Sequence, residues 1–298
     1  MTEQAPTLGF TGSIGFIGLG VMGGGMCANV ARKHGAPVHA YDMNRDALAA
    51  AVQAGAVAAA SVADVAAAAE LIFLSLPGGK QVAAVCEAVA DVARSGTVIV
   101  DLSTTSVADA RNIAAKLAVQ GILFADAPVA RTRQAAIDGT LSIMVGADTE
   151  LYARIAPLLS LMGSDVSLCG GTGCGQVVKL INNTLLFENV AAIAEMMVVG
   201  ERNGVDAETL IKVVGLGSGN SFALQNHGAK AMSPRVFPNR AFPSTYALKD
   251  LGYAIELAMQ SGVELRVAQL AADYYQAAVA AGIGEQYFPA IIQLIGKD

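Results

Sequence analysis

The sequence has no tryptophan, and aromatic residues together make up only 5% of its 298 residues. Charged residues are also scarce, at 15%, whereas hydrophobic residues reach 54%. This composition excludes intrinsic disorder, coiled coils and collagen. The length exceeds one ordinary domain and fits two, because compact domains usually contain about 100–200 residues.

The chain also lacks basic clusters and long apolar runs. Its net charge is −6, from 25 acidic and 19 basic residues, which is the wrong sign for a nucleic-acid surface. No uncharged apolar stretch reaches the roughly 18 residues of a membrane span. Residues 1–12 lack the basic and apolar regions of a signal peptide, so we expect a loose tail there. These absences predict a soluble, cytoplasmic protein with neither nucleic-acid nor membrane partners.

Cysteine and histidine are rare, with four and three residues. Cys169 and Cys174 are the only close cysteine pair, and no CxxC or CxxH spacing accompanies them. We therefore expect no metal site. The favoured interpretation is that the thiols are reduced and serve as small apolar side chains.

Short apolar runs alternate with helix-forming segments from Ser13 to about Leu168. The runs cover residues 14–19, 37–41, 71–76, 97–102, 123–129, 141–146 and 166–169. Nearly continuous Val, Ile and Leu is typical of strands that are buried on both faces. The intervening segments, such as 44–54, 79–94 and 107–120, favour helices. This order predicts an α/β domain over residues 13–170, with a Rossmann-type, doubly wound parallel sheet.

The pattern changes after Gly170. Residues 176–202 contain no proline, and apolar positions cover nearly the whole circumference, as in a helix buried all round. The segments 246–260 and 266–281 also have helical spacing. We therefore expect an all-α domain over residues 171–298, joined through a long central helix. A Gly-, Ser-, Asn- and Pro-rich loop at 215–244 is long enough for a functional role.

A glycine motif directly follows the first predicted strand. Gly18, Gly20 and Gly23 form GxGxxG at the start of a helix, and Asp42 ends the second strand. This is the dinucleotide-binding fingerprint, in which the helix N–H groups face the pyrophosphate. Asp42 favours NAD over NADP, because a carboxylate accepts ribose hydroxyls and repels a 2′-phosphate, although Arg45 would soften that preference. The alternative is a glycine turn without a ligand.

Lys179 and Asn183 are four residues apart in the predicted central helix, so they stand on one face, one turn apart. A buried ionisable group in a cleft is a candidate catalytic group. Alternatively, the stem of Lys179 is buried while its ammonium reaches water, and Asn182 and Asn183 only bond neighbouring helices. The spacing alone leaves both interpretations open.

Two further segments place polar side chains after predicted strands. DLSTTS carries the hydroxyls of Ser103 and Thr104, either of which would alternatively cap the next helix. DAPVARTRQAAIDGTL brings Arg131 and Arg133 to the carboxyl edge of the sheet, where doubly wound folds bind ligands. Arginine suits an anionic group there, but either arginine is alternatively a solvated helix charge.

Over nearly its full length the sequence resembles the β-hydroxyacid dehydrogenases, which include 3-hydroxyisobutyrate dehydrogenases and tartronate semialdehyde reductases. The motifs that carry the resemblance are IGFIGLGVMG, DLSTTS, DAPV with DGTL, GxGxxxKLINN (173–183) and AF with KDL (241–251). The resemblance implies a Rossmann domain, an all-α domain and an active site in the cleft between them. It also implies a homodimer or homotetramer formed through the helical domain.

The resemblance further implies site residues. The catalytic residues it implies are Lys179, Asn183, Thr104 and Asp250, with Lys179 as the proton donor or acceptor. The substrate-binding residues are Ala130, Arg131, Thr132 and Phe242. The cofactor-binding residues are Gly18, Gly20, Val21, Met22, Gly23, Asp42, Leu76, Pro77, Thr104 and Lys249. No metal is needed, because an ammonium polarises a carbonyl.

One segment departs from the family pattern. Most of the family reads DAPVSGG, whereas Ala130, Arg131 and Thr132 stand here in place of the serine and glycines. This resembles the PVGRT variant of sulfolactaldehyde reductases, whose arginine helps to hold a sulfonate. The sequence thus predicts an NAD-dependent dehydrogenase or semialdehyde reductase for a short anionic 3-hydroxy compound, such as 3-hydroxyisobutyrate or glycerate. The alternatives are a sulfolactaldehyde reductase, an imine reductase and a non-catalytic NADH-binding module.

Overall fold

The computed structural model describes residues 9–239 and 241–296. The chain divides into two compact units, Met1–Lys179 and Leu180–Asp298. The division falls inside the helix α8 (Cys174–Arg202), nine residues after the boundary that the sequence predicts. The first eight residues of the expected tail lie outside the described residues. Phe10, from the remainder of that tail, is buried beneath the Arg154 guanidinium.

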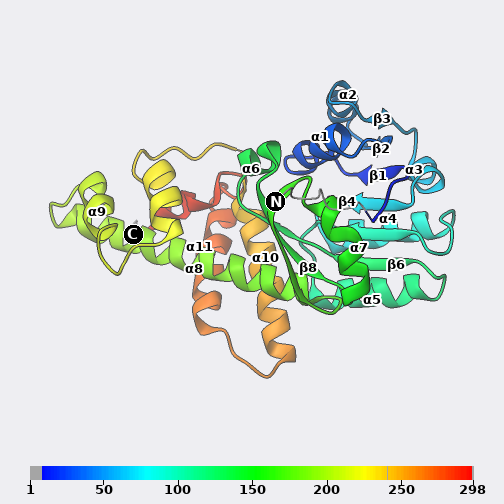
Figure 1. The fold of residues 1–298 in the computed structure, drawn as a ribbon. Helices are drawn as coiled ribbons and strands as arrows, with labels where there is room; N and C mark the ends of the chain where they lie inside the picture. The colour runs from blue at the N-terminus through cyan, green and yellow to red at the C-terminus, as the bar shows by residue number, and fades with distance from the viewer. Residues whose placement is uncertain (1–8, 240, 297–298) are drawn as a thin grey trace, which may run out of the picture. The chain divides into compact units, whose positions relative to one another are not determined.

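The first unit contains one sheet with the strand order β3-β2-β1-β4-β5-β6-β8-β7, and β9 pairs with β8 (Figure 1). Its strands are β1 (Ile14–Ile17), β2 (Val38–Tyr41), β3 (Val57–Ala58), β4 (Leu71–Leu74), β5 (Val98–Asp101), β6 (Leu123–Asp126), β7 (Val129–Ala130), β8 (Leu141–Gly146) and β9 (Gly163–Gly170). The strands β1 to β6 pair in parallel, which confirms the predicted doubly wound sheet. The antiparallel pairing of β8 with β6 and β7 was not predicted.

Both faces of this sheet are buried, which explains the continuous apolar runs. Leu71 and Phe73 of β4 belong to the hydrophobic core on one face, and Ile72 and Leu74 belong to the core on the other. Successive side chains of a strand point to opposite faces, so a strand covered on both sides needs apolar residues at every position. The covering helices are α1 (Gly23–Lys33), α2 (Arg45–Gln53), α3 (Val62–Ala68), α4 (Gly79–Ala90), α5 (Val107–Ala118), α6 (Arg133–Asp138) and α7 (Thr149–Leu159).

Short polar side chains set where several of these helices begin. Asn44 accepts hydrogen bonds from the second and third N–H groups of α2. Ser106 caps α5 and Asp148 caps α7, each by accepting a hydrogen bond from one N–H group. Such caps satisfy N–H groups that have no partner inside the helix. The loops that carry Asp42 and Thr104 therefore lead into helices whose first residues are fixed by a local cap.

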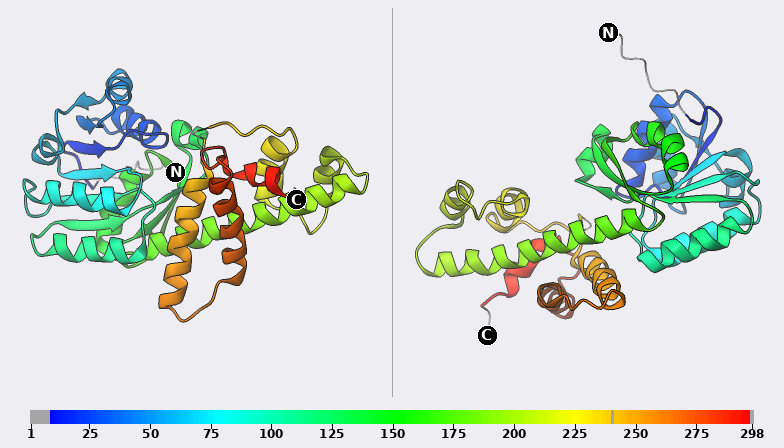
Figure 2. Two further views of the ribbon diagram at one scale, coloured as in Figure 1. Left: turned by 180° about the vertical axis from the view of Figure 1, so that it is seen from behind. Right: turned by 60° about the horizontal axis from the view of Figure 1, so that its bottom comes forward.

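The second unit is helical, which confirms the predicted all-α part of the fold. It contains the rest of α8, then α9 (Ala207–Val214), a π-helix η1 (Leu224–Met232), α10 (Ser244–Gln260), α11 (Arg266–Ala280) and a 3₁₀ helix η2 (Phe288–Leu294). Figure 2 shows α10 and α11 as a packed pair. The core gathers around Phe187, Tyr275 and Phe288. The segment expected as a loop over residues 215–244 contains η1, so it is only partly irregular.

The expectation that the central helix is buried all round is wrong for this chain. Along α8 the side chains of Val178, Ile181, Leu185, Met196 and Val199 are exposed, and their spacing puts them in one stripe. The opposite side holds Phe187, Val190 and Met197 in the core. Among the described residues, α8 is the one helix that is long and apolar enough to cross a membrane. Core helices of soluble proteins meet the same criterion of length and hydropathy.

Candidate active site

The glycine turn after β1 has the close approaches that require glycine. Gly18 has φ +93°, and a Cβ there would collide with the carbonyl oxygen of Ser75, which follows β4. A Cβ on Gly23 would collide with the carbonyl oxygen of Gly18 itself. The order of the strands reverses between β1 and β4, and doubly wound folds bind ligands at such a reversal, at the carboxyl ends of the strands. The motif therefore stands where the fingerprint requires it.

The same turn fits a dinucleotide. A Cβ on Gly20 would have no heavy atom of the described residues within 4 Å, so the backbone there is open to a ligand. Within the part of the chain that the structure describes, no side chain caps α1, and its first turn carries no acidic residue. The free N–H groups at a helix start attract phosphate. Exposed Val21 and half-buried Met22 belong to this turn.

Asp42 links the end of β2 to the glycine turn. Its Oδ2 accepts a hydrogen bond of 2.6 Å from the N–H of Leu19, and its Oδ1 accepts one of 2.7 Å from the N–H of Asn44. Each carboxylate oxygen has a second lone pair, so the group retains capacity to accept two ribose hydroxyls. Arg45 is exposed at the start of α2. The carboxylate that would face the ribose is thus already oriented by the fold.

The beginning of α8 is fixed by a carboxylate from the sheet. Asp126, at the end of β6, is fully buried, and it accepts hydrogen bonds from the N–H groups of Gly173 (2.6 Å) and Gln176 (2.8 Å). It thus replaces the N-cap side chain that most helices supply locally. Burial raises the pKa of Asp126 above its usual value, and the backbone N–H donors oppose this shift. A Cβ on Gly175 would press on this carboxylate, so glycine leaves it room.

Gln176, in the first turn of α8, joins the helix to the segment DLSTTS. Its Nε2 donates to the carbonyl oxygen of Ser103 (2.8 Å), and its Oε1 accepts from the N–H of Thr105 (3.1 Å). Ser103 and Thr105 are buried, and Thr104 between them is half-buried. The Ser103 hydroxyl accepts from the N–H of Leu76, so the 103–105 loop is also tied to the segment after β4, where Pro77 is exposed.

Lys179 follows Gln176 by three residues and is buried, with 8% of its surface exposed. One turn further along α8, Asn183 donates from Nδ2 to Asp250 of α10 at 2.7 Å, and Asn182 donates to the Oδ1 of Asn183 at 3.1 Å. The structure therefore joins Asn183 and Asp250, which are 67 residues apart. Both are buried, so the amide of Asn183 is held in one orientation.

Two other expected site residues, Lys249 and Phe242, lie in the second unit. The Nζ of Lys249 is 3.3 Å from the Oδ1 of Asp250, and it lies over the rings of Tyr246 and Tyr253. Phe242 is half-buried and stacks on Phe187 with ring centroids 6.1 Å apart. Lys249 thus belongs to the second unit, whereas the other expected cofactor residues belong to the first.

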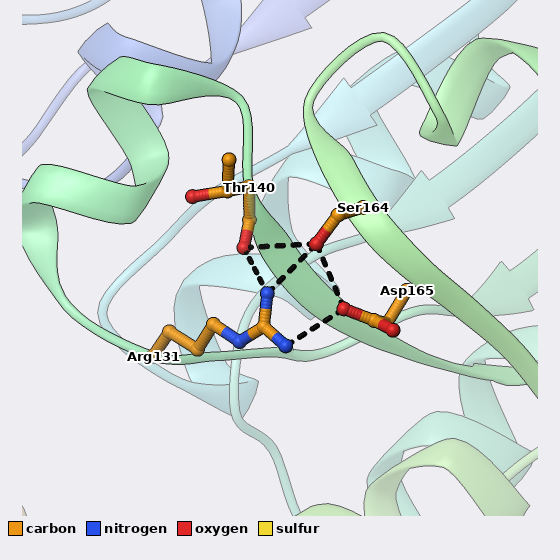
Figure 3. Close-up of polar contacts among 4 residues, drawn as sticks. All are labelled: Arg131, Thr140, Ser164 and Asp165. Atoms are coloured by element: carbon orange, nitrogen blue, oxygen red, sulfur yellow. Dashed lines mark hydrogen bonds and ion pairs between the residues drawn. The ribbon is translucent and has the colours of Figure 1, made fainter.

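Arg131 occupies a backbone position that favours glycine. Its φ is +86°, in the left-handed region where side chains are strained. Figure 3 shows its guanidinium bonded to the Thr140 carbonyl oxygen, to Ser164 (2.8 Å) and to Asp165 (2.7 Å). The bonds from Ser164 and Arg131 lower the pKa of the Asp165 carboxyl, because they stabilise its ionised form. If Arg131 holds a substrate anion, as expected, it must do so with N–H groups other than those that donate to Thr140, Ser164 and Asp165.

The neighbours of Arg131 lie in regular elements. Half-buried Ala130 belongs to β7, where it pairs with Ser142 of β8. Thr132 is exposed, and its hydroxyl caps α6 by accepting from the N–H of Ala135. In residues 9–239 and 241–296, no group of three or more His, Cys, Asp or Glu side chains has the arrangement of a metal site.

Sequence reasoning missed Asp126 and Gln176. Asp126 follows an apolar run, as Asp42 and Asp101 do. A carboxylate at the end of a predicted strand is the feature from which its role could have been predicted. Gln176 had no comparable signal, because its partners in the 103–105 loop are more than 70 residues away.

Comparison with known families agrees with this arrangement. Residues 13–171 match the family model described as the NAD binding domain of 6-phosphogluconate dehydrogenase. Residues 173–295 match the model described as "NAD-binding of NADP-dependent 3-hydroxyisobutyrate dehydrogenase". The chain belongs to the β-hydroxyacid dehydrogenase family. As a member it is an NAD(P)-dependent oxidoreductase that acts on CH–OH groups.

Named relatives of this dehydrogenase cover nearly the whole chain. The 2-(hydroxymethyl)glutarate dehydrogenase of Eubacterium barkeri is 37% identical, over 94% of both chains. The 3-sulfolactaldehyde reductase of Escherichia coli is 33% identical, over 95% of both. The solved 3-hydroxyisobutyrate dehydrogenase of Mycobacterium tuberculosis, with L-serine, has a TM-score of 0.88 at 32% identity, and the match covers 97% of this chain and all of that one. The relatives act on small hydroxy acids or aldehydes, which differ from one to the next.

Proposed function

We propose that this dehydrogenase interconverts a short anionic 3-hydroxy acid and its semialdehyde, with NAD(H) preferred over NADP(H). The observation that carries the proposal is the buried Lys179, on a helix turn that is hydrogen-bonded to the loop of Thr104. A buried amine beside a fixed hydroxyl-bearing loop is the arrangement that proton transfer to a carbonyl oxygen requires. It also argues against a non-catalytic NADH-binding module, which gives no reason for a buried lysine.

Each residue has a distinct task in this proposal. Bound nicotinamide supplies the hydride chemistry. Lys179 donates a proton to the carbonyl oxygen in reduction and accepts the hydroxyl proton in oxidation. In the first unit, Thr104 orients the substrate and the segment 130–132 contacts it, while the turn from Gly18 to Gly23, with Asp42, Leu76 and Pro77, binds the cofactor. The family resemblance assigns substrate binding also to Asn183, whose amide Asp250 holds, and to Phe242, and it assigns cofactor binding also to Lys249.

The first experiment compares rates of NADH oxidation with three aldehydes at equal concentrations and pH 7. Methylmalonate semialdehyde and tartronate semialdehyde carry carboxylates, and sulfolactaldehyde carries a sulfonate. A preference for either carboxylate supports the proposal. A preference for the sulfonate supports the second candidate, a sulfolactaldehyde reductase, which the 33% identity to such a reductase and the presence of Arg131 favour. NADH binding without turnover on any aldehyde contradicts both.

Arg131→Ala is expected to raise KM for the anionic substrate about 10- to 100-fold, because a hydrogen bond to a charged group contributes about 1.5–3 kcal/mol. Arg131→Gly is the matched control, since glycine accepts φ +86° without strain. A raised KM in both variants means that the guanidinium holds the anion. A KM that is raised in Arg131→Ala alone means that only the backbone conformation matters. An unchanged KM in both variants removes Arg131 from substrate binding.

Asp42→Ala is expected to raise KM for NAD by about 10-fold or more and to narrow the preference for NAD over NADP, because the carboxylate no longer binds the ribose or repels a 2′-phosphate. Asp42→Asn retains an acceptor for the N–H of Leu19, so it separates the effect of charge from damage to the turn. Initial rates with both cofactors measure the ratio. An unchanged ratio would assign the preference to another residue, such as Arg45.

We further propose that the enzyme is a cytoplasmic homodimer or homotetramer. The exposed stripe on α8, from Val178 to Val199, supports an assembly, because exposed apolar patches of this kind commonly mark contacts between proteins. A second copy of the same chain is the partner that the family resemblance favours. Static light scattering of the purified chain tests the number of copies.

A further inference from the structure

We propose that Gln176 is a positioning residue that fixes Thr104 relative to Lys179. The inference rests on the proposed function, to which it adds a residue that touches neither substrate nor cofactor. Gln176 has no exposed surface, and its carboxamide forms two hydrogen bonds with the backbone on either side of Thr104. One side chain thus holds the loop where the substrate-side hydroxyl is expected.

The loop is also held from the sheet. The N–H of Ser103 donates to the Oδ1 of Asp101 at 2.9 Å, and the Ser103 hydroxyl accepts from the N–H of Leu76 at 2.8 Å. These bonds fix the beginning of the loop, whereas its continuation at Thr105 is bonded to Gln176. Removing the Gln176 carboxamide therefore leaves these two bonds of Ser103 in place and removes the hydrogen bond that the N–H of Thr105 donates.

The other end of the connection is the turn that carries Lys179. Positions three apart on an α-helix are neighbours on one face and differ by about 4.5 Å along the axis. That turn is itself fixed, because Asp126 accepts from the main-chain N–H of Gln176. The bonds from Asp126 through Gln176 to the 103–105 loop therefore hold the backbone around Thr104 against the helix turn that carries Lys179.

The chemistry of the carboxamide explains why glutamine is needed. Gln176 donates to a carbonyl oxygen and accepts from an N–H with the two ends of one planar group. An ionised glutamate only accepts, so it would repel the Ser103 oxygen, and methionine provides neither bond. Catalytic groups must be held closely, since a misplacement of about 1 Å is enough to cost roughly 100-fold in rate.

The test uses Gln176→Met in the full-length enzyme, with Thr184→Val as the control. Thr184 is a buried polar residue of α8 whose hydroxyl has no hydrogen-bond partner among the described residues. We expect Gln176→Met to lower kcat, counted per NADH-binding site, by about 10- to 100-fold. We expect Thr184→Val to leave kcat unchanged. Counting per site removes any loss of folded protein from the comparison.

A second variant, Gln176→Glu, keeps the shape and gives the test a pH signature. A protonated glutamate again donates and accepts, so its kcat is expected to approach that of the wild type as the pH is lowered. A purely structural role would not produce this convergence. In a double-mutant cycle, Gln176→Met should cost much less when Thr104 is already replaced by valine.

Hydrogen–deuterium exchange at the Thr105 amide provides a readout that does not depend on activity. Faster exchange in Gln176→Met, with kcat per site lowered, is the expected result. Unchanged exchange, unchanged kcat per site or full additivity with Thr104→Val would each overturn the positioning role. A wild-type enzyme without turnover on any aldehyde would instead contradict the proposed function, and the exchange result would still report on the bonds of Gln176.

Discussion

Replacing Lys179 by alanine is expected to lower turnover on the order of 10²- to 10⁴-fold, which is the usual contribution of a general acid or base. NADH should still bind, because the glycine turn and Asp42 lie in other segments of the first unit. Turnover is measured from the absorbance of NADH, and binding from its fluorescence. Near-normal turnover in this variant would remove Lys179 from the proposed mechanism.

Two further variants separate the charge of Lys179 from its proton. Arginine keeps a positive charge but does not release its proton at neutral pH, so Lys179→Arg should remain nearly as slow as Lys179→Ala. Lys212→Ala, in the exposed part of α9, is the control and should have normal turnover. Recovery of turnover with arginine would mean that Lys179 acts by its charge alone.

Asp126→Ala is expected to lower the free energy of unfolding by about 2–6 kcal/mol, because the carboxylate accepts from two main-chain N–H groups and each buried donor that loses its partner costs about 1–3 kcal/mol. The same change should slow the enzyme, because the turn that carries Lys179 loses its anchor. Denaturation by urea, followed by circular dichroism, measures the loss of stability.

The control for this prediction is Asp148→Ala. Asp148 caps α7 by accepting from the N–H of Leu151 at 2.8 Å, but it is exposed, so its loss should cost only about 1 kcal/mol. Asp126→Asn keeps one acceptor oxygen, so its loss of unfolding free energy should lie between those of Asp126→Ala and Asp148→Ala. Equal losses for Asp126→Ala and Asp148→Ala would mean that burial of the carboxylate adds nothing to the strength of the cap.

The parts of the fold that the sequence predicted depend on local spacing. The glycine turn, Asp42 at the end of β2, and Lys179 one turn before Asn183 are each defined within a few residues or one βαβ unit. Strands buried on both faces are recognised by their unbroken apolar runs. Local spacing alone is therefore enough to place the glycine turn directly after a strand and Lys179 on a helix, as the structure has them.

The parts that the sequence did not predict depend on distant partners. Arg131 bonds to Asp165, 34 residues away, and nothing in either local sequence pairs them. The antiparallel pairing of β8 with β6 and β7 is likewise a choice of strand neighbour, which periodicity does not encode. The exposed stripe on α8 was misread because a residue pattern records hydrophobicity, not which surface covers it.

The capping of α8 by Asp126 has a consequence for the order in which the chain folds. The acceptor lies at the end of β6, about 50 residues before the helix that it caps. Both ends of these bonds belong to the first unit, and domains generally fold as units, so we expect the first turn of α8 to form together with the sheet and not before it. An acceptor held by the sheet offsets the unfavourable nucleation of a helix in isolation.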